Sequence, residues 1–168
     1  MWKELTFYSL ILCLLGLAFQ DFKSRKIDLW LLIVMGFLVL ICAGLNNDLK
    51  TTLTQTGINL GFLAIQLLLV SLYFSMKAGG FVNIADKYLG WGDIVFLVLI
   101  TPLFSPLNFL YYYSAALFIT LTFSFIYFMI SPKPDKKIPL ISGLSLTLVL
   151  VLVLSKFLSY NLYTDFLF

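Results

Sequence analysis

The sequence predicts an all-α membrane protein, a polytopic bundle of about six transmembrane helices in which residues 1–168 form one domain. Of its 168 residues, 61% are hydrophobic and only 11% are charged, and the mean hydropathy is +1.02. A water-soluble domain carries about 25% charged residues, so this chain has too little polar surface to cover a soluble globule. The apolar residues also form runs close to the roughly 20 residues that a helix needs to cross a bilayer.

Each predicted helix is an apolar run bounded by polar or helix-breaking residues. The fourth run is short because Pro102 interrupts it, although apolar residues continue toward Pro106. Gly57 and Gly61 in the third run form a pair of small residues four apart, a spacing that permits close helix packing. The predicted segments are residues 5–19, 29–45, 57–74, 93–103, 107–130 and 139–157.

The composition excludes several kinds of functional site. The chain has no His, so it can build neither a His-based metal site nor a Ser-His triad. Cys13 and Cys42 lie inside apolar runs and form no CxxC pair, which predicts buried apolar cysteines rather than a thiolate zinc site. The net charge of +3 does not indicate nucleic-acid binding. We therefore expect a lipid bilayer around the chain, and no metal, cofactor or nucleic acid.

The basic residues predict the orientation in the membrane. Eight of the eleven Lys and Arg residues follow the first, third and fifth predicted helices, whereas three lie on the other side. Loops rich in Lys and Arg stay in the cytoplasm, so these three loops are predicted to be cytoplasmic and both termini to lie outside a cytoplasmic (inner) membrane. The eight are Lys23, Arg25, Lys26, Lys77, Lys87, Lys133, Lys136 and Lys137.

Two acidic residues stand at ends of predicted helices on the same side of the membrane. Asp21 directly follows the first apolar run, where a charge that helps to end the helix is the alternative interpretation. Asp93 opens the fourth run, where a helix cap is the alternative. The predicted orientation puts both carboxyl groups near the cytoplasmic face, so they would meet if the first and fourth helices pack together.

Two carboxyl groups that meet support a specific chemistry. They share a proton, because two neighbouring carboxylates cannot easily both ionise. One can then accept a proton from water while the other protonates the carbonyl of a scissile peptide bond. Gly90 and Gly92 lack side chains and would let a substrate backbone approach Asp93. The pattern predicts Asp21 and Asp93 as catalytic residues, and Gly90 and Gly92 as substrate-binding residues.

These segments resemble the motifs of the type IV prepilin peptidases and the archaeal preflagellin peptidases. Gly90-Trp91-Gly92-Asp93 resembles their GxGD motif. Residues 21–30 resemble their other motif, in which an Asp is followed by basic residues, an Ile and an aromatic residue. Ile138-Pro139 before the last helix resembles a third feature. The likeness extends over most of the chain, from about residue 5 to about residue 158.

The resemblance implies a hydrolase that removes short basic leader peptides from prepilin-like proteins at the cytoplasmic membrane face. Its catalytic aspartates would be Asp21 and Asp93. The sequence departs from the family where Asp28 replaces the usual Pro and Val95 replaces a frequent Lys. Larger members carry an N-terminal insertion with a four-cysteine zinc site linked to N-methylation of the product. This chain has two cysteines, so the short form without methylation is implied.

Three other interpretations stay open at the level of sequence. A presenilin-type intramembrane protease also uses GxGD, but Gln20 rather than Tyr precedes Asp21 here. A small proton-coupled transporter would place an ionisable group near mid-membrane, whereas the polar residues nearest that depth are the neutral Asn59 and Gln66. A non-catalytic assembly factor with a peptidase-like fold would not need the intact pair of aspartates.

The membrane orientation predicted from the basic residues can be tested with reporter fusions. We expect reporters fused after Lys26 and Lys137 to be cytoplasmic and a reporter fused after Lys50 to lie outside, because loops rich in Lys and Arg are retained in the cytoplasm. Paired alkaline phosphatase and green fluorescent protein fusions measure both locations. The reverse pattern would contradict the predicted orientation.

Overall fold

The chain is helical along almost all of its described length. The computed structural model describes residues 2–24, 28–80, 90–130 and 140–165, and no strand occurs among them. Five helices are long and apolar enough to cross a membrane, and α5 with η1 forms a shorter apolar helix. This confirms the predicted all-α membrane bundle. The elements are α1 (Trp2–Ser24), α2 (Leu29–Asn46), α3 (Leu49–Ala78), α5 (Trp91–Ile100), the 3-10 helix η1 (Thr101–Leu103), α6 (Pro106–Ile130) and α7 (Leu140–Phe157).

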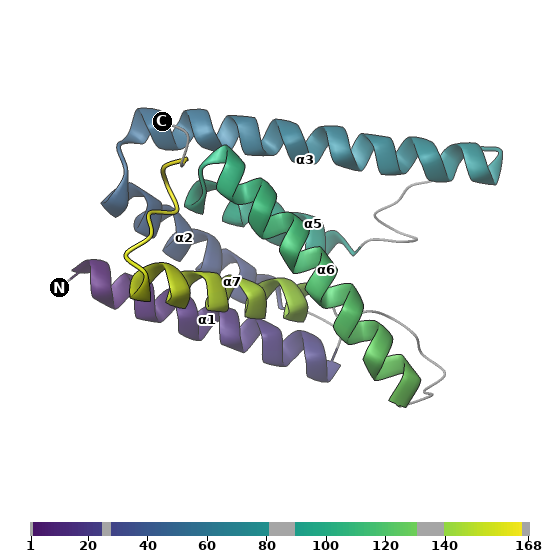
Figure 1. The fold of residues 1–168 in the computed structure, drawn as a ribbon, viewed down its shortest axis with the longest axis horizontal. Coiled ribbons are helices and arrows are strands. Elements are labelled where there is room, and N and C mark those ends of the chain that lie inside the picture. Colours follow the sequence, from purple (N-terminus) through teal and green to yellow (C-terminus); the bar gives the residue numbers. More distant parts are fainter. Residues whose placement is uncertain (1, 25–27, 81–89, 131–139, 166–168) are drawn as a thin grey trace.

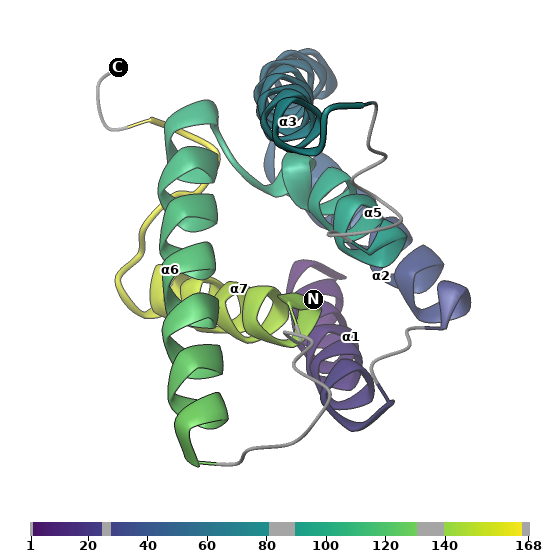
Figure 2. The ribbon, with the colours of Figure 1, turned by 90° about the vertical axis from the view of Figure 1, so that its right-hand side faces the viewer.

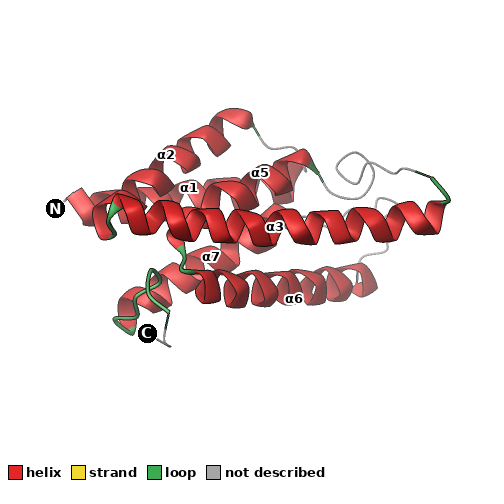
Figure 3. Cartoon of the chain, turned by 90° about the horizontal axis from the view of Figure 1, so that it is seen from above, coloured by secondary structure: helices red, strands yellow, loops and turns green. Residues whose placement is uncertain are grey.

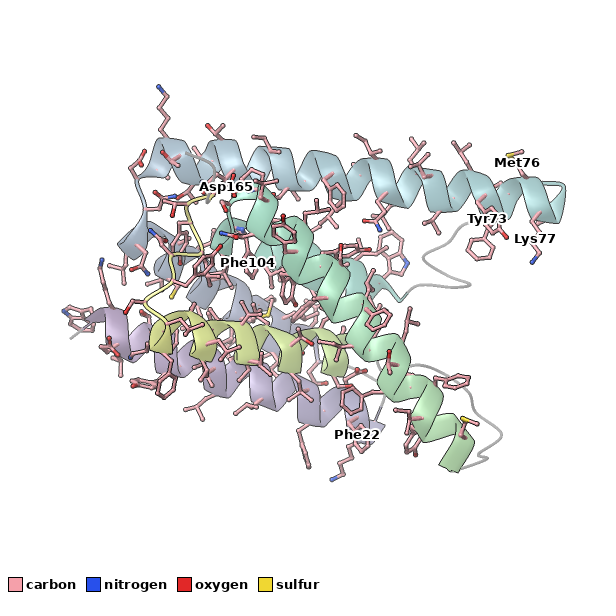
Figure 4. The ribbon with its side chains drawn as sticks, in the orientation of Figure 1. Phe22, Tyr73, Met76, Lys77, Phe104 and Asp165 are labelled. Atoms are coloured by element: carbon pink, nitrogen blue, oxygen red, sulfur yellow. The ribbon has the colours of Figure 1, made fainter. Side chains whose placement is uncertain are left out.

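The helices pack around an antiparallel pair formed by α1 and α7 (Figure 1). Viewed along the bundle, α7 lies between α1 and α6, and α5 lies beside α2 (Figure 2). The long helix α3 lies on the side away from α1 and projects beyond its neighbours at one end (Figures 1 and 3). Tyr73, Met76 and Lys77 extend from this projecting end (Figure 4). Helix ends that are far apart in sequence therefore lie at the same end of the bundle.

Apolar stripes at helical spacing build the core. Leu10, Leu14 and Leu17 recur on one face of α1, and each side chain is 0% exposed. Leu144 and Leu148 form the corresponding buried stripe on α7. Residues three and four apart share a helix face, so these stripes turn toward one another. The other faces carry many exposed large apolar side chains, as expected of helices that contact lipid.

Helix α3 begins earlier than its apolar pattern predicts. It starts at Leu49, whereas the predicted segment starts at residue 57. The reason is a cap: the Asp48 carboxylate accepts a hydrogen bond of 3.0 Å from the backbone N–H of Thr51. At its other end, Gly79 adopts the left-handed conformation with φ 68°, which a glycine tolerates and which ends the helix.

The break after α5 is satisfied by a side chain from α3. Helix α5 ends at Ile100, and Pro102 lies in the 3-10 turn that follows. The Asn59 amide, 1% exposed, donates to the backbone carbonyls of Thr101 (3.1 Å) and Phe104 (3.0 Å). Lipid cannot satisfy such carbonyls, so the protein has to supply the donor. Asn59 therefore stabilises the turn after α5.

Polar contacts close the end of the bundle where both termini lie. The Lys156 ammonium at the end of α7 donates to Glu4 and Tyr8 at the start of α1. The Asn108 amide on α6 donates to the backbone carbonyl of Leu162, 3.0 Å away. The segment after α7 thus packs against the start of α6, where Figure 4 also places Asp165.

The glycine pair Gly57 and Gly61 does not mark a close helix contact within the described part of this chain. A Cβ atom added to either residue would meet nothing within 4 Å. A Cβ atom added to Gly143 would lie 2.1 Å from Thr120 Oγ1. Helices α6 and α7 therefore contact each other where Gly143 faces Thr120, and only a glycine fits there.

A larger residue at this contact should destabilise the bundle. We expect Gly143→Ala to lower the free energy of unfolding by about 1–3 kcal/mol, because α6 and α7 must move apart. Thr120→Ala should recover part of the loss, since it removes two of the three nearest atoms. Gly61→Ala is the matched control and should cost nothing. Unfolding in mixed micelles measures the free energy of unfolding of the wild type and of each variant. Equal losses in Gly143→Ala and Gly61→Ala would exclude the close contact as the cause.

Candidate active site

The fold brings the end of α1 and the beginnings of α5 and α7 to one end of the bundle. This is the right-hand end in Figure 1, and it faces the viewer in Figure 2. Asp21 lies in the last turn of α1, and Asp93 lies in the first turn of α5. The two aspartates singled out by the sequence therefore lie at the same end, although 71 positions separate them in the chain.

Asp21 is buried and bonded to a distant segment. Its side chain is 7% exposed, and Oδ2 accepts hydrogen bonds from the backbone N–H (2.8 Å) and the hydroxyl (3.0 Å) of Ser142. Ser142 is the third residue of α7, where backbone N–H groups have no partner within the helix. The Asp21 carboxylate thus caps α7, and the partial positive charge of that helix end favours its negative charge. A charge that merely ends α1 would not be buried in this way.

Asp93 makes a local bond and is partly buried. Its Oδ2 accepts a hydrogen bond of 3.1 Å from the backbone N–H of Gly90, the residue before α5. This bond is one half of a capping box. Asp93 therefore has the geometry of a helix cap, which was the alternative interpretation of this residue. A Cβ atom at residue 90 would lie 3.1 Å from Asp93 Oδ2, so a larger residue there would crowd the carboxyl group.

The two carboxyl groups also interact through their charges. Burial away from water raises the pKa of Asp93 to about 6, the hydrogen bond from Gly90 opposes this, and the negative charge of Asp21 raises the pKa further. Asp93 lies in the first turn of α5, and α5 is shorter than the five helices that could span the membrane. Asp93 therefore carries a proton for much of the time near pH 6, and the charge of Asp21 contributes to this.

The remaining residues of the two motifs have simpler surroundings. Gly92 lies in the first turn of α5 and is partly buried, as is Asp93, whereas Trp91 is exposed. Asp28 is exposed at the start of α2, and its Oδ2 accepts a hydrogen bond of 2.6 Å from the Gln20 amide. Arg25, Lys26, Ile27, Ile138 and Pro139 lie outside the described residues.

The sequence did not single out Ser142. It is one of several buried hydroxyl groups on α6 and α7, but Thr120, Ser145 and Thr147 donate to carbonyls of their own helices. Ser142 instead donates to another helix. The only signal in the sequence is a serine three positions after Pro139, at the start of an apolar run. That pattern predicts a helix beginning and does not identify Asp21 as the partner.

The described residues contain no group of three or more His, Cys, Asp or Glu side chains that could hold a metal ion. Cys42 is buried, Cys13 is partly buried, and neither forms a disulfide. Among the described residues, the polar side chains at this end of the bundle include the carboxyl groups of Asp21 and Asp93 and the hydroxyl group of Ser142.

Comparisons with models of protein families, with curated proteins and with solved structures find no match to the chain.

The proton on Asp93 can be detected by infrared spectroscopy. We expect a carbonyl band of a protonated carboxyl group that disappears as the pH rises through about 6 and that is absent from Asp93→Asn. Asp21→Asn should move this transition to lower pH, because it removes the neighbouring negative charge. Asp28→Asn is the control and should leave the transition in place. A transition that persists in Asp93→Asn would assign the band to another group.

Proposed function

We propose that this chain is a membrane aspartic endopeptidase that cleaves leader peptides from type IV prepilin-like proteins. The observation that carries the proposal is that two carboxyl groups from distant segments lie at one end of an apolar bundle, where the charge of Asp21 contributes to the raised pKa of Asp93. One of them, Asp21, is buried and accepts two hydrogen bonds. The other, Asp93, has a pKa raised to about 6, chiefly by burial and in part by Asp21. Perturbed pairs of this kind are typical of sites that transfer protons.

The proposed reaction uses one ionised and one protonated carboxyl group. Asp21 removes a proton from a water molecule, and the water oxygen attacks the carbonyl carbon of the scissile peptide bond. Asp93 gives its proton to the carbonyl oxygen, which avoids a free oxyanion. The tetrahedral intermediate then collapses: its hydroxyl proton returns to Asp93, the proton held by Asp21 passes to the leaving nitrogen, and the C–N bond breaks. Both carboxyl groups end in their starting states.

The proposed substrate follows from the motifs and from the position of the site. The GxGD segment around Asp93 and the segment after Asp21 resemble those of the prepilin peptidases, whose substrates carry short basic leaders. Gly90 lies beside the Asp93 carboxyl group, and an extended substrate backbone would approach there together with Gly92. The distribution of Lys and Arg supports a site that faces the cytoplasm, in an inner membrane, with both termini outside.

A non-catalytic assembly factor is the second candidate. It is favoured by one observation: both aspartates accept hydrogen bonds at helix N-termini, which a purely structural role would also use. A proton-coupled transporter has less support, because Asn59 is bonded to the backbone of η1 and of Phe104 rather than lying beside an ionisable group.

Replacement of either aspartate tests the proposal. Asp21→Asn and Asp93→Asn keep the shape of the side chain but cannot accept and return a proton. Each should lower the rate of leader cleavage by about three or more orders of magnitude, and the double variant should be hardly slower than either single one. The assay is co-expression with a prepilin-like protein, followed by N-terminal sequencing of the product.

Asp28→Asn is the matched control, because Asp28 is exposed and bonded to Gln20. It should retain most of the cleavage rate. Cleavage at the normal rate by either dyad variant would reject the proposal. Wild-type protein that assembles with a prepilin-like protein but never cleaves it would instead favour the assembly factor.

A further inference from the structure

We propose that Ser142 is the positioning residue of the aspartate pair: it fixes Asp21 through Oδ2, so that Oδ1 is the oxygen that removes the proton from water. The inference rests on the proposed function and assigns the two aspartates different roles, Asp21 as the base and Asp93 as the acid. Ser142 contacts neither water nor substrate in this scheme and acts only through Asp21.

The geometry gives Oδ2 and Oδ1 of Asp21 different surroundings. Both hydrogen bonds from Ser142, at 2.8 Å and 3.0 Å, end on Oδ2. Oδ1 has no hydrogen bond from any residue in the described part of the chain. Two donors on one residue fix the position and the rotation of the carboxyl group, because its plane must satisfy both. One oxygen atom is thereby held by α7, and we assign the proton transfer to the other.

A purely structural role explains this contact less well. Asp21 and Ser142 are 7% and 5% exposed, and a buried polar pair can often be replaced by apolar groups at little cost in stability. Helices α1 and α7 are already joined by their leucine stripes and, at the opposite end, by Lys156 and Glu4. The contact between Asp21 and Ser142 therefore adds more to the orientation of one carboxyl group than to the packing of two helices.

The contact also separates the roles of the two aspartates. Ser142 donates two hydrogen bonds to Asp21, and neither needs Asp21 to carry a proton. Asp93 receives a backbone bond at 3.1 Å, and its pKa is raised chiefly by burial. Asp21 is therefore the carboxyl group held in one orientation, which suits the base, and Asp93 is assigned the role of the acid.

The test compares three variants of α7. Ser142→Ala removes the hydroxyl but keeps the backbone N–H, so the helix cap is retained in part. We expect it to lower kcat by about tenfold to a hundredfold, the value of a hydrogen bond to a charged group, with KM changed less than about twofold. Ser142→Thr restores the donor and should recover most of kcat. Ser145→Ala, which removes a buried hydroxyl that serves only its own helix, should cleave at nearly the wild-type rate.

A second measurement does not depend on cleavage. Carbodiimides react with protonated carboxyl groups in apolar surroundings, and peptide mass spectrometry locates the adduct. Labelling of Asp21 should rise about tenfold in Ser142→Ala and not in Ser142→Thr or Ser145→Ala, because the Ser142 hydroxyl no longer occupies Oδ2 of Asp21.

The outcomes separate this inference from the proposed function. If the wild type cleaves leaders and Ser142→Ala is as active and as weakly labelled as Ser145→Ala, the role of Ser142 is rejected while the peptidase stands. If no prepilin-like protein is cleaved but Asp21 labelling still depends on Ser142, the contact orients Asp21 as inferred and the peptidase is rejected. A loss of kcat in Ser142→Ala that Thr does not restore would also reject the role of Ser142.

Discussion

The structure depends on one constraint: the bundle must satisfy its own polar backbone groups wherever water is absent. A helix leaves four N–H groups and four carbonyls without partners at its ends, and lipid offers no replacement. Three side chains meet this need at different ends: Asp48 for α3, Asn59 for the turn after α5 and Asp21 for α7. Each of these three side chains therefore satisfies the backbone at a helix end or a helix break.

This constraint explains why the helices could be predicted and where the prediction was incomplete. Continuous apolar runs identified five of the segments closely, since hydropathy is the main determinant of a membrane helix. The start of α3 was placed too late, because six of the eight residues 49–56 are polar and the Asp48 cap begins the helix before them. The spacing of Gly57 and Gly61 permits close packing, yet it is Gly143 that lies against a neighbouring helix. Glycine spacing alone does not indicate which helix face meets a neighbour.

The candidate site was predictable only in part. The position of Asp21 and Asp93 at one end of the bundle followed from counting helices between them. The bond from Ser142 to Asp21 joins residues 121 positions apart, so no local pattern in the sequence contains it. The raised pKa of Asp93 has the same origin, because burial and the charge of Asp21 both arise from tertiary packing.

The 30 residues of α3 have a further consequence. At 1.5 Å per residue the helix is about 45 Å long, whereas the hydrocarbon layer of a bilayer is about 30 Å thick. Such a mismatch is relieved by tilt, by local thickening of the bilayer or by extension into the headgroup layer. The end that projects beyond the other helices carries Tyr73 and Lys77, an aromatic and a basic side chain suited to the membrane interface (Figure 4). This end lies on the same side of the bundle as the end of α1 and the start of α5, which carry the two aspartates (Figure 1). Extension of α3 into the headgroup layer would thus occur on the side of the membrane that carries the candidate site.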